Sequence, residues 1–300
     1  MSQSNYRVHH HAHLASSSSR AQLAVAILDV GNSELLAESL NWYTSSFNYA
    51  LFVVTREGNN DIEALLERYP SVRFLVFSRY ASYGERINVV ANECGANYFL
   101  VTRSDVLLVH FDGKTLFDSQ RSYVAWASVI ANVHKEIVPS VRIPHLANHG
   151  LDPQSAFPAM EEGQVIRTLY PAMGLGLYNR ALFQRLRGFD ERIKSEYHQL
   201  LDWGIRIALM GHRVVTGKSL LMQYIERESI IEDRTEREGH LRCSTKALSF
   251  AKTRKGKIIL KRPKRQYFDR EAWNVEVKHR LRWQVKSDFA TLVSSWQERQ

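Results

Sequence analysis

The stretch Tyr98-Phe99-Leu100-Val101-Thr102-Arg103-Ser104-Asp105-Val106-Leu107-Leu108 decides the fold. In it, an aromatic and apolar run leads into a polar turn with a single carboxylate, and a second apolar run follows at once. A short, uninterrupted apolar run that ends in a turn is typical of a buried parallel strand. Ligands bind beyond the carboxyl ends of such strands in open α/β sheets. We therefore expect Asp105 to be exposed at that edge, where it can meet a phosphate-bound cation.

The same alternation extends on the N-terminal side of this stretch. Apolar runs at residues 23–28, 49–54, 72–77 and 98–101 predict strands, and the segments between them carry apolar residues at helical spacing. Strands that alternate with helices in this way predict a parallel sheet with right-handed crossovers. The sequence therefore predicts an α/β fold, a mostly parallel central sheet flanked by helices.

The chain divides into three regions. Residues 1–22 are polar, with clustered histidines and serines, which favours a disordered leader over a metal-binding histidine tract. Residues 23–231 form the α/β domain, and residues 232–300 form a basic helical C-terminal extension. The second half of the domain is expected to contain strands at 123–130 and 173–178, a loop at 145–163, and helices at 179–186 and 198–210.

Composition narrows the class of protein. The apolar share of 44% and the charged share of 24% are those of an ordinary globular protein. Two distant cysteines, Cys94 and Cys243, lack metal-type spacing and predict no disulfide. No apolar run approaches the roughly 20 residues that span a bilayer, and we find no signal peptide. We expect a cytoplasmic protein, with membrane association left open.

The net charge of +9 belongs to the C-terminal extension. Residues 252–300 hold 14 Lys and Arg against 5 Asp and Glu, so the rest of the chain is neutral. A helix there is expected to carry Leu281, Val285, Phe289, Leu292 and Trp296 on one face. A basic segment beside such a face suits an anionic membrane surface. Nucleic-acid binding is the second interpretation. The third is a helix that packs its apolar stripe on the α/β domain.

Several ordered motifs resemble those of the family-2 glycosyltransferases, whose GT-A fold has a Rossmann-like sheet. Residues 26–32 look like the opening strand and turn of that family, and residues 53–61 resemble its nucleotide-binding loop. Arg103-Ser104-Asp105 stands where the family has Asp-X-Asp. The remaining matches are Gly84–Asn92, the Gly-Phe-Asp-Glu run at 188–191, and Asp202, Arg206 and Gly211 in the following helix. The resemblance implies a glycosyltransferase that moves a sugar from a nucleotide-sugar donor to a glycan or lipid-linked acceptor, with inversion.

The resemblance also implies a set of site residues. The donor would be bound by Glu57 and Asp61 near the nucleoside, together with Gly84, Asn88, Arg103, Ser104 and Asp105. Asp105 would bind a divalent metal, Mn²⁺ or Mg²⁺, which prefers oxygen ligands beside phosphate. Asp202 and Asp190 would be the catalytic carboxylates on the acceptor side.

The departures from the family pattern leave alternatives open. Arg103 replaces the first metal-binding aspartate, which weakens the metal expectation: either its guanidinium neutralises the phosphates, or the site is inactive. Gln199 and Leu200 stand at the general-base positions, and neither can take a proton. Glu196, His198, Asp190 and Asp202 are the substitutes, although Asp202 could instead cap its helix. The alternative functions are therefore a catalytically impaired GT-A-like binding or scaffold protein, and a nucleic-acid-associated protein that uses the basic tail.

Overall fold

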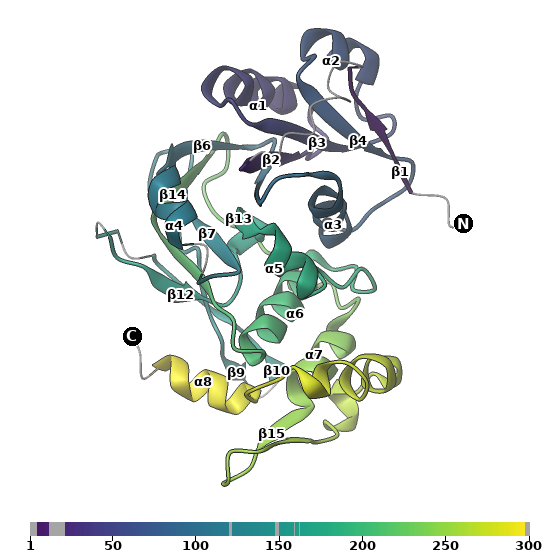
Figure 1. Ribbon diagram of the computed structural model, residues 1–300, viewed down its shortest axis with the longest axis vertical. Helices are drawn as coiled ribbons and strands as arrows, with labels where there is room; N and C mark the ends of the chain where they lie inside the picture. The colour runs from purple at the N-terminus through teal and green to yellow at the C-terminus, as the bar shows by residue number, and fades with distance from the viewer. Residues whose placement is uncertain are drawn as a thin grey trace.

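One large sheet with helices on both faces organises the molecule (Figure 1). The computed structural model describes residues 5–11, 22–119, 122–147, 150–158, 160–161 and 163–297. Two hydrophobic clusters, one on each face of the sheet, form the core. Helix α1 (Ser33–Ser46) packs into one cluster through Leu36, Leu40 and Tyr43. Helices α3 (Tyr83–Glu93) and α6 (Glu196–Leu209) pack into the other.

The N-terminal half of the sheet is parallel, which confirms the predicted α/β class. Its strands are β2 (Leu23–Leu28), β3 (Ala50–Arg56), β4 (Val72–Phe77) and β5 (Tyr98–Arg103). They lie in the order β4-β3-β2-β5, with every neighbour parallel. The chain therefore reverses its direction of winding beside β2, and ligands bind at such a switch point in open α/β sheets.

The second half of the sheet mixes strand directions. Strand β13 (Gly176–Asn179) is antiparallel to both β5 and β7 (Ala125–Ala131), and β14 (Val214–Tyr224) is parallel to β7. Gly176 permits this pairing, because a Cβ there would stand 2.5 Å from the carbonyl oxygen of Trp126. The edges are completed by β12 (Ile166–Thr168) and β6 (Val106–Phe111), both paired with β14.

Short elements connect these strands. They are α2 (Ile62–Arg68), α4 (Gly113–Ser119), α5 (Arg180–Arg185), β8 (Val141–Ile143), β9 (Leu146–Ala147), β10 (Gly150–Leu151), β11 (Gln154–Ala156) and the 3-10 turn η2 (Ala172–Gly174). In its described part, the expected loop at 145–163 thus contains the small ladder β9–β10 and the strand β11, which pairs with β8 just before the loop.

The expected exclusion of residues 1–22 from the fold is wrong for part of that segment. Strand β1 (Tyr6–His9) pairs antiparallel with β4 and forms the edge of the sheet (Figure 1). The hydroxyl of Tyr6 also donates to Glu93 at 2.5 Å. Backbone pairing therefore orders this polar segment although its sequence carries little apolar content. Residues 12–21, with His13 and the serine row, lie outside the described residues.

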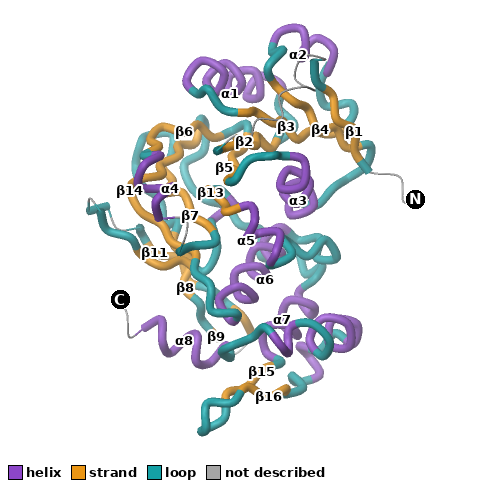
Figure 2. The backbone as a smooth tube through the Cα atoms, viewed as in Figure 1, coloured by secondary structure: helices purple, strands orange, loops and turns teal. Residues whose placement is uncertain are grey.

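The C-terminal extension packs on the sheet domain beside α6 (Figure 2). It comprises α7 (His240–Leu248), the hairpin β15 (Phe250–Lys252) with β16 (Ile258–Leu260), the 3-10 turns η3 (Arg265–Tyr267) and η5 (Leu281–Trp283), the π-helix η4 (Ala272–Val277), and α8 (Phe289–Gln297). The expected single amphipathic helix is therefore wrong. Its apolar stripe is at most 8% exposed at every position and belongs to the core, as the third interpretation of the tail anticipated.

The described chain contains no helix that is long and apolar enough to cross a membrane.

Candidate functional site

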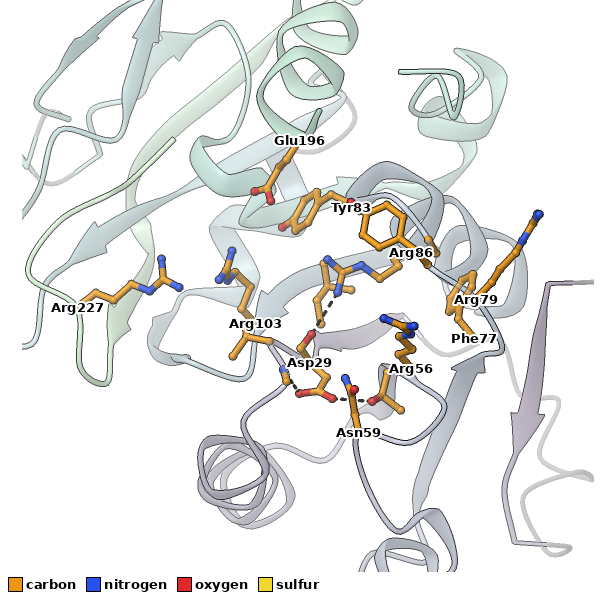
Figure 3. Close-up of a pocket in the computed structure, with 16 residues that line it drawn as sticks. Asp29, Arg56, Asn59, Phe77, Arg79, Tyr83, Arg86, Arg103, Glu196 and Arg227 are labelled. Carbon is orange, nitrogen blue, oxygen red and sulfur yellow. Dashed lines mark hydrogen bonds between the residues drawn. The ribbon is translucent and has the colours of Figure 1, made fainter. Parts of the chain in front are cut away.

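A cavity of about 340 Å³ opens at the carboxyl ends of the parallel strands (Figure 3). Its walls begin at residues that end β2, β3, β4 and β5 or come shortly after them, so four strands contribute to it. The remaining walls come from the start of α3, the start of α6 and the segment after β14. The cavity is thus at the switch point beside β2, the place where an open α/β sheet binds ligands.

Arginine side chains dominate this cavity. Its lining contains five of them: Arg56, Arg79, Arg86, Arg103 and Arg227. The lining carboxylates are Asp29 and Glu196. Guanidinium groups are permanent cations whose fork of N–H donors matches phosphate oxygens. The electrostatic character of the cavity therefore suits an anionic ligand that carries phosphate.

Asp29 ties the ends of the strands together through three hydrogen bonds. Its Oδ1 accepts from the backbone N–H of Gly31 at 2.8 Å. Its Oδ2 accepts from the hydroxyl of Thr55 at 2.6 Å and from the amide of Asn60 at 2.8 Å. Asp29 is 5% exposed and both of its oxygens accept hydrogen bonds, so it fixes the loop after β3 against the end of β2.

Asp105 is held between two arginines. Its Oδ1 lies 3.0 Å from Nε of Arg103, and its Oδ2 lies 2.9 Å from Nε of Arg227 and 3.3 Å from Nη2 of Arg103. The side chain is 4% exposed. The expectation of an exposed carboxylate at the mouth of the sheet is therefore wrong. Arg103 and Arg227 line the cavity, and Asp105 lies behind them.

Arg103 remains charged in this position. Burial alone would lower the pKa of its guanidinium, but Asp105, together with Tyr83 and Glu196, outweighs burial and raises the pKa above its usual value. Figure 3 shows Arg103 and Arg227 directing their guanidinium groups toward each other. Two like charges can approach in this way because Asp105 lies between them as their shared counter-ion.

Glu196 forms the opposite wall, on the first turn of α6 (Figure 3). Its buried Oε1 has no hydrogen-bond partner among the described residues. Burial raises the pKa of this carboxyl group, although the charges of Arg103 and Arg86 act in the opposite direction. A carboxyl group with a raised pKa and an unused oxygen at a cavity is a candidate proton acceptor.

Tyr83 and Arg86 complete that wall from α3. The Tyr83 hydroxyl donates to the backbone carbonyl of Met173, and the Arg86 guanidinium lies over the Tyr83 ring, 5.5 Å from its centroid. Arg86 Nη1 donates to the carbonyl oxygen of Asp29 at 3.2 Å, whereas its buried Nε has no hydrogen-bond partner in the described chain. This N–H is therefore a donor that no described residue uses, on a side chain that lines the cavity.

The predicted catalytic carboxylates Asp190 and Asp202 do not line this cavity. Both are bound by Lys246 of α7, whose Nζ lies 2.6 Å from a carboxylate oxygen of each. Arg242 lies 2.6 Å from Asp190, and Arg206 lies 3.4 Å from Asp202. Burial alone would raise the pKa of Asp190, but Lys246 and Arg242 hold it well below the usual range. These carboxylates join α6 to the C-terminal extension.

Gly84 and Asn88, predicted to bind the donor, connect α3 to the start of α6. The N–H of Gly84 donates to Oε1 of Gln199 at 2.8 Å, and a Cβ at Gly84 would stand 2.5 Å from Cβ of Phe189. The amide of Asn88 donates to the Phe189 carbonyl at 2.9 Å and accepts from the Phe189 N–H at 2.9 Å. Gln199, at the family's general-base position, is thus an interhelical hydrogen-bond partner.

The other predicted donor residues have local roles. Glu57 is exposed in the turn after β3, and Asp61 caps α2 by accepting from the N–H of Ala64 at 3.1 Å. The hydroxyl of Ser104 is buried and accepts from the N–H of Val30 at 3.1 Å, which holds the ends of β2 and β5 together. Arg103 is the predicted site residue that lines the cavity.

The residues at this edge do not fit a divalent metal. Mn²⁺ and Mg²⁺ beside a diphosphate require several hard oxygen ligands, usually carboxylates. Both oxygens of Asp105 already accept from guanidinium groups, and both oxygens of Asp29 already accept hydrogen bonds from the protein. The described residues contain no group of three or more His, Cys, Asp or Glu side chains that could hold a metal ion.

Sequence reasoning missed most of the lining. Arg56 and Asp29 were readable, since each directly follows or ends an apolar run, the position where a parallel strand meets its ligand. Arg227 gave no such signal because it reaches Asp105 from a loop far along the chain. Glu196 was considered only as a substitute base, since the helix was expected to begin at residue 198 and the structure begins it at Glu196.

The fold can be compared with known proteins. No protein-family model matches this sequence, and no curated protein does either. The solved structure of GalNAc-T7 with UDP, GalNAc and Mn²⁺ matches with a TM-score of 0.55, at 11% identity over 69% of this chain and 44% of that one. The structure of S. aureus TarS matches with a TM-score of 0.50, at 15% identity over 75% of this chain and 38% of that one.

These similarities confirm the expected GT-A-like glycosyltransferase fold. The chain spans less than half of the length of either matched protein.

Proposed function

We propose that this protein is a glycosyltransferase that transfers a sugar from a nucleoside-diphosphate donor to a hydroxyl group of a glycan or lipid-linked acceptor. The observation that carries the proposal is the arginine-lined cavity at the carboxyl ends of β2–β5. The proposal is further supported by the GT-A-like fold, since both matched proteins are glycosyltransferases and one of them was solved with UDP and GalNAc.

The donor would lie across the ends of the strands. Arg103 and Arg227 line one side of the cavity with their guanidinium groups close together, where a diphosphate would meet two positive charges at once. Arg56 ends β3 and Asn59 follows it, and both line the part of the cavity closest to the loop that the resemblance assigned to the nucleoside. In this arrangement Glu57 and Asp61 shape the loop from outside the cavity.

Glu196 is the carboxylate we assign to the acceptor side, in place of Asp202 and Asp190. In an inverting transfer, the acceptor oxygen forms a bond to the anomeric carbon while the bond from that carbon to the diphosphate oxygen breaks. The acceptor proton passes to Glu196, and the arginines stabilise the negative charge that leaves with the diphosphate. The raised pKa of Glu196 suits a group that must hold this proton.

An anionic membrane surface is the partner that we assign to the C-terminal extension. The contact surface differs from the expected helix, because the apolar stripe is buried. Instead, the hairpin region from Lys252 to Arg265 carries eight exposed basic residues and no acidic one. Trp283 is 76% exposed, and its neighbour Arg282 lines the same surface hollow as the hairpin residues Lys257 and Ile259. Exposed basic and aromatic side chains of this kind suit an anionic lipid interface.

The test of the proposed function is a panel of nucleotide sugars with different bases. Thermal shift detects which donor binds, and release of the nucleoside diphosphate measures hydrolysis and transfer. Stabilisation by one donor class, with diphosphate release that increases when an acceptor extract is added, is the expected result. If no donor in the panel changes the melting temperature, the proposed function is wrong.

A catalytically impaired binding protein is the second candidate, and Gln199 and Leu200 at the general-base positions favour it. Gln199 is fully engaged with Gly84 and Ser82, so it cannot act on a substrate without breaking the α3–α6 contact. Donor binding without any diphosphate release, in the presence of a broad acceptor extract, would support this candidate over the enzyme.

A further inference from the structure

We propose that this cavity binds the donor diphosphate through arginine side chains and without a divalent cation. The inference rests on the proposed function, because it concerns the same site and the same ligand. Arg103, Arg227 and Arg86 would neutralise the charge of the diphosphate, which is the role of the metal ion in a metal-dependent site. Asp105 would be a positioning residue for Arg103 and Arg227.

The first step is the state of Asp105. Its two oxygens accept from Arg103 and Arg227 at 2.9–3.3 Å, and the side chain is 4% exposed behind those arginines. A metal ion could reach this carboxylate only by displacing both guanidinium groups, which would then lie unpaired beside a doubly charged cation. Like charges at such separations repel strongly in a partly buried site. The carboxylate is therefore committed to the arginines.

The second step concerns the N–H donors that the arginines keep free for a ligand. A guanidinium group carries five N–H donors, and its ion pair with Asp105 uses one or two of them. The side chain of Arg227 is 35% exposed, so it keeps access to the cavity. Arg86 adds an N–H at Nε that has no partner in the described chain. Charge-assisted bonds of this type are the strongest that a protein offers to phosphate.

The third step is the charge balance. Five arginines line the cavity, against two lining carboxylates, Asp29 and Glu196, and a third, Asp105, directly behind two of the arginines. The cavity thus has an excess of positive charge before any ligand enters. A diphosphate supplies the opposite charge directly, whereas a divalent cation would add to the excess. The lining is therefore complementary to the anion alone.

The experiment is isothermal titration of the full-length protein with UDP, GDP, ADP, CDP and inorganic pyrophosphate. Each titration is done once with excess EDTA and once with Mn²⁺. For the best ligand we expect dissociation constants that agree within about twofold, because guanidinium groups need no metal to bind phosphate. Binding that requires Mn²⁺ would overturn the inference while leaving the proposed function intact. An absence of binding in both conditions would overturn both.

Three variants sharpen the result. Arg227→Gln removes one charge-assisted contact and should weaken binding about tenfold in EDTA. Asp105→Asn should bind at least as tightly as the wild type, because the two arginines lose a competing anion, whereas a metal ligand at this position predicts loss of binding. Arg185→Gln, on exposed α5 and outside the cavity, is the matched control and should have no effect.

Melting temperatures confirm that each variant is folded. If Asp105→Asn does not fold, Arg227→Gln still tests the inference. The side chain of Arg227 is partly exposed, and its removal leaves Asp105 paired with Arg103, so this variant should fold. Unchanged affinity of Arg227→Gln for every ligand would overturn the inference.

Discussion

The Nζ of Lys246, on α7, lies 2.6 Å from Oδ2 of Asp190, and Asp190 is in the turn between α5 and α6. The same Nζ lies 2.6 Å from Oδ1 of Asp202. One lysine of the C-terminal extension therefore bridges both carboxylates that the resemblance assigned to catalysis. The side chains of Lys246 and Asp202 are at most 4% exposed, so this contact is part of the interior.

Lys246→Met is expected to destabilise the protein by about 3 kcal/mol, because it leaves two buried carboxylates with fewer cationic partners. Urea denaturation measures the free energy of unfolding. The matched control is Lys218→Met, at an exposed position of β14, where a change within about 0.5 kcal/mol is expected. Equal stability of the two variants would show that the buried ion pairs contribute nothing.

The ion pairs of Asp190 should also make the free energy of unfolding depend on pH in acid. Its folded pKa is depressed, so its ion pairs contribute fully above the ordinary carboxyl value of about 4 and are lost as the pH falls below that value. The free energy of unfolding should therefore decrease with falling pH below about 4, and this dependence should be weaker in Asp190→Asn. The same variant should still bind the nucleotide, since Asp190 does not line the arginine cavity.

Glu196→Gln tests the assigned general base. Transfer should fall by about 100-fold to 10,000-fold, the range that general base catalysis supplies. Nucleotide affinity should be retained or improved, because one negative charge leaves the cavity. In the wild type, the rate should rise with pH through a midpoint above the ordinary glutamate value of about 4.3, since burial raises the pKa of Glu196.

Glu67→Gln, at an exposed position of α2, is the control for this series. Full transfer activity in Glu196→Gln, or an unchanged pH profile, would remove Glu196 from the mechanism.

The buried parallel strands were predictable because uninterrupted apolar runs have few other places in a globular protein. Strand β5 and its turn illustrate the limit of this reasoning. The run at 98–103 placed Asp105 at the correct edge, but its exposure depended on Arg227, a residue from the other end of the sheet domain. No local pattern indicates which distant cation reaches a carboxylate.

In the C-terminal extension, too, the local sequence pattern did not identify the packing partner. The stripe from Leu281 to Trp296 was correctly identified as apolar, but an apolar stripe packs equally well on a membrane or on the protein itself. The structure shows the second outcome, with Val285 and Phe289 in the same hydrophobic cluster as α6. Strand β1 was missed for a related reason, since an edge strand is held by backbone pairing and needs little apolar content.

The burial of His198 should cause a second loss of stability, at a higher pH than the loss caused by Asp190. It is 5% exposed, with its Nδ1 3.1 Å from the hydroxyl of Ser195 and its ring beside that of His240. Burial and His240 lower its pKa from 6.5 to about 4. The unfolded chain binds this proton first, so stability should fall as the pH decreases from about 6.5 to about 4, by up to about 3 kcal/mol.

His198→Gln should reduce this pH dependence in urea denaturation curves recorded across that range. His110→Gln, at an exposed position of β6, should leave it unchanged. A wild-type stability that is constant between pH 6.5 and 4 would contradict the burial of a neutral His198.

The hairpin β15–β16 is expected to bind anionic vesicles. The full-length protein should co-sediment with vesicles that contain phosphatidylglycerol and not with pure phosphatidylcholine, and added salt should weaken the binding.

Replacing both Lys255 and Lys257 by Gln should reduce affinity about tenfold or more, since each basic residue near such a surface contributes about 1 kcal/mol. Trp283→Ala should add a loss that salt does not change, because the indole contributes through its apolar area. Lys218→Gln, away from the hairpin, is the matched control. Salt-sensitive retention on DNA or RNA, without binding to either type of vesicle, would assign this surface to nucleic acid instead.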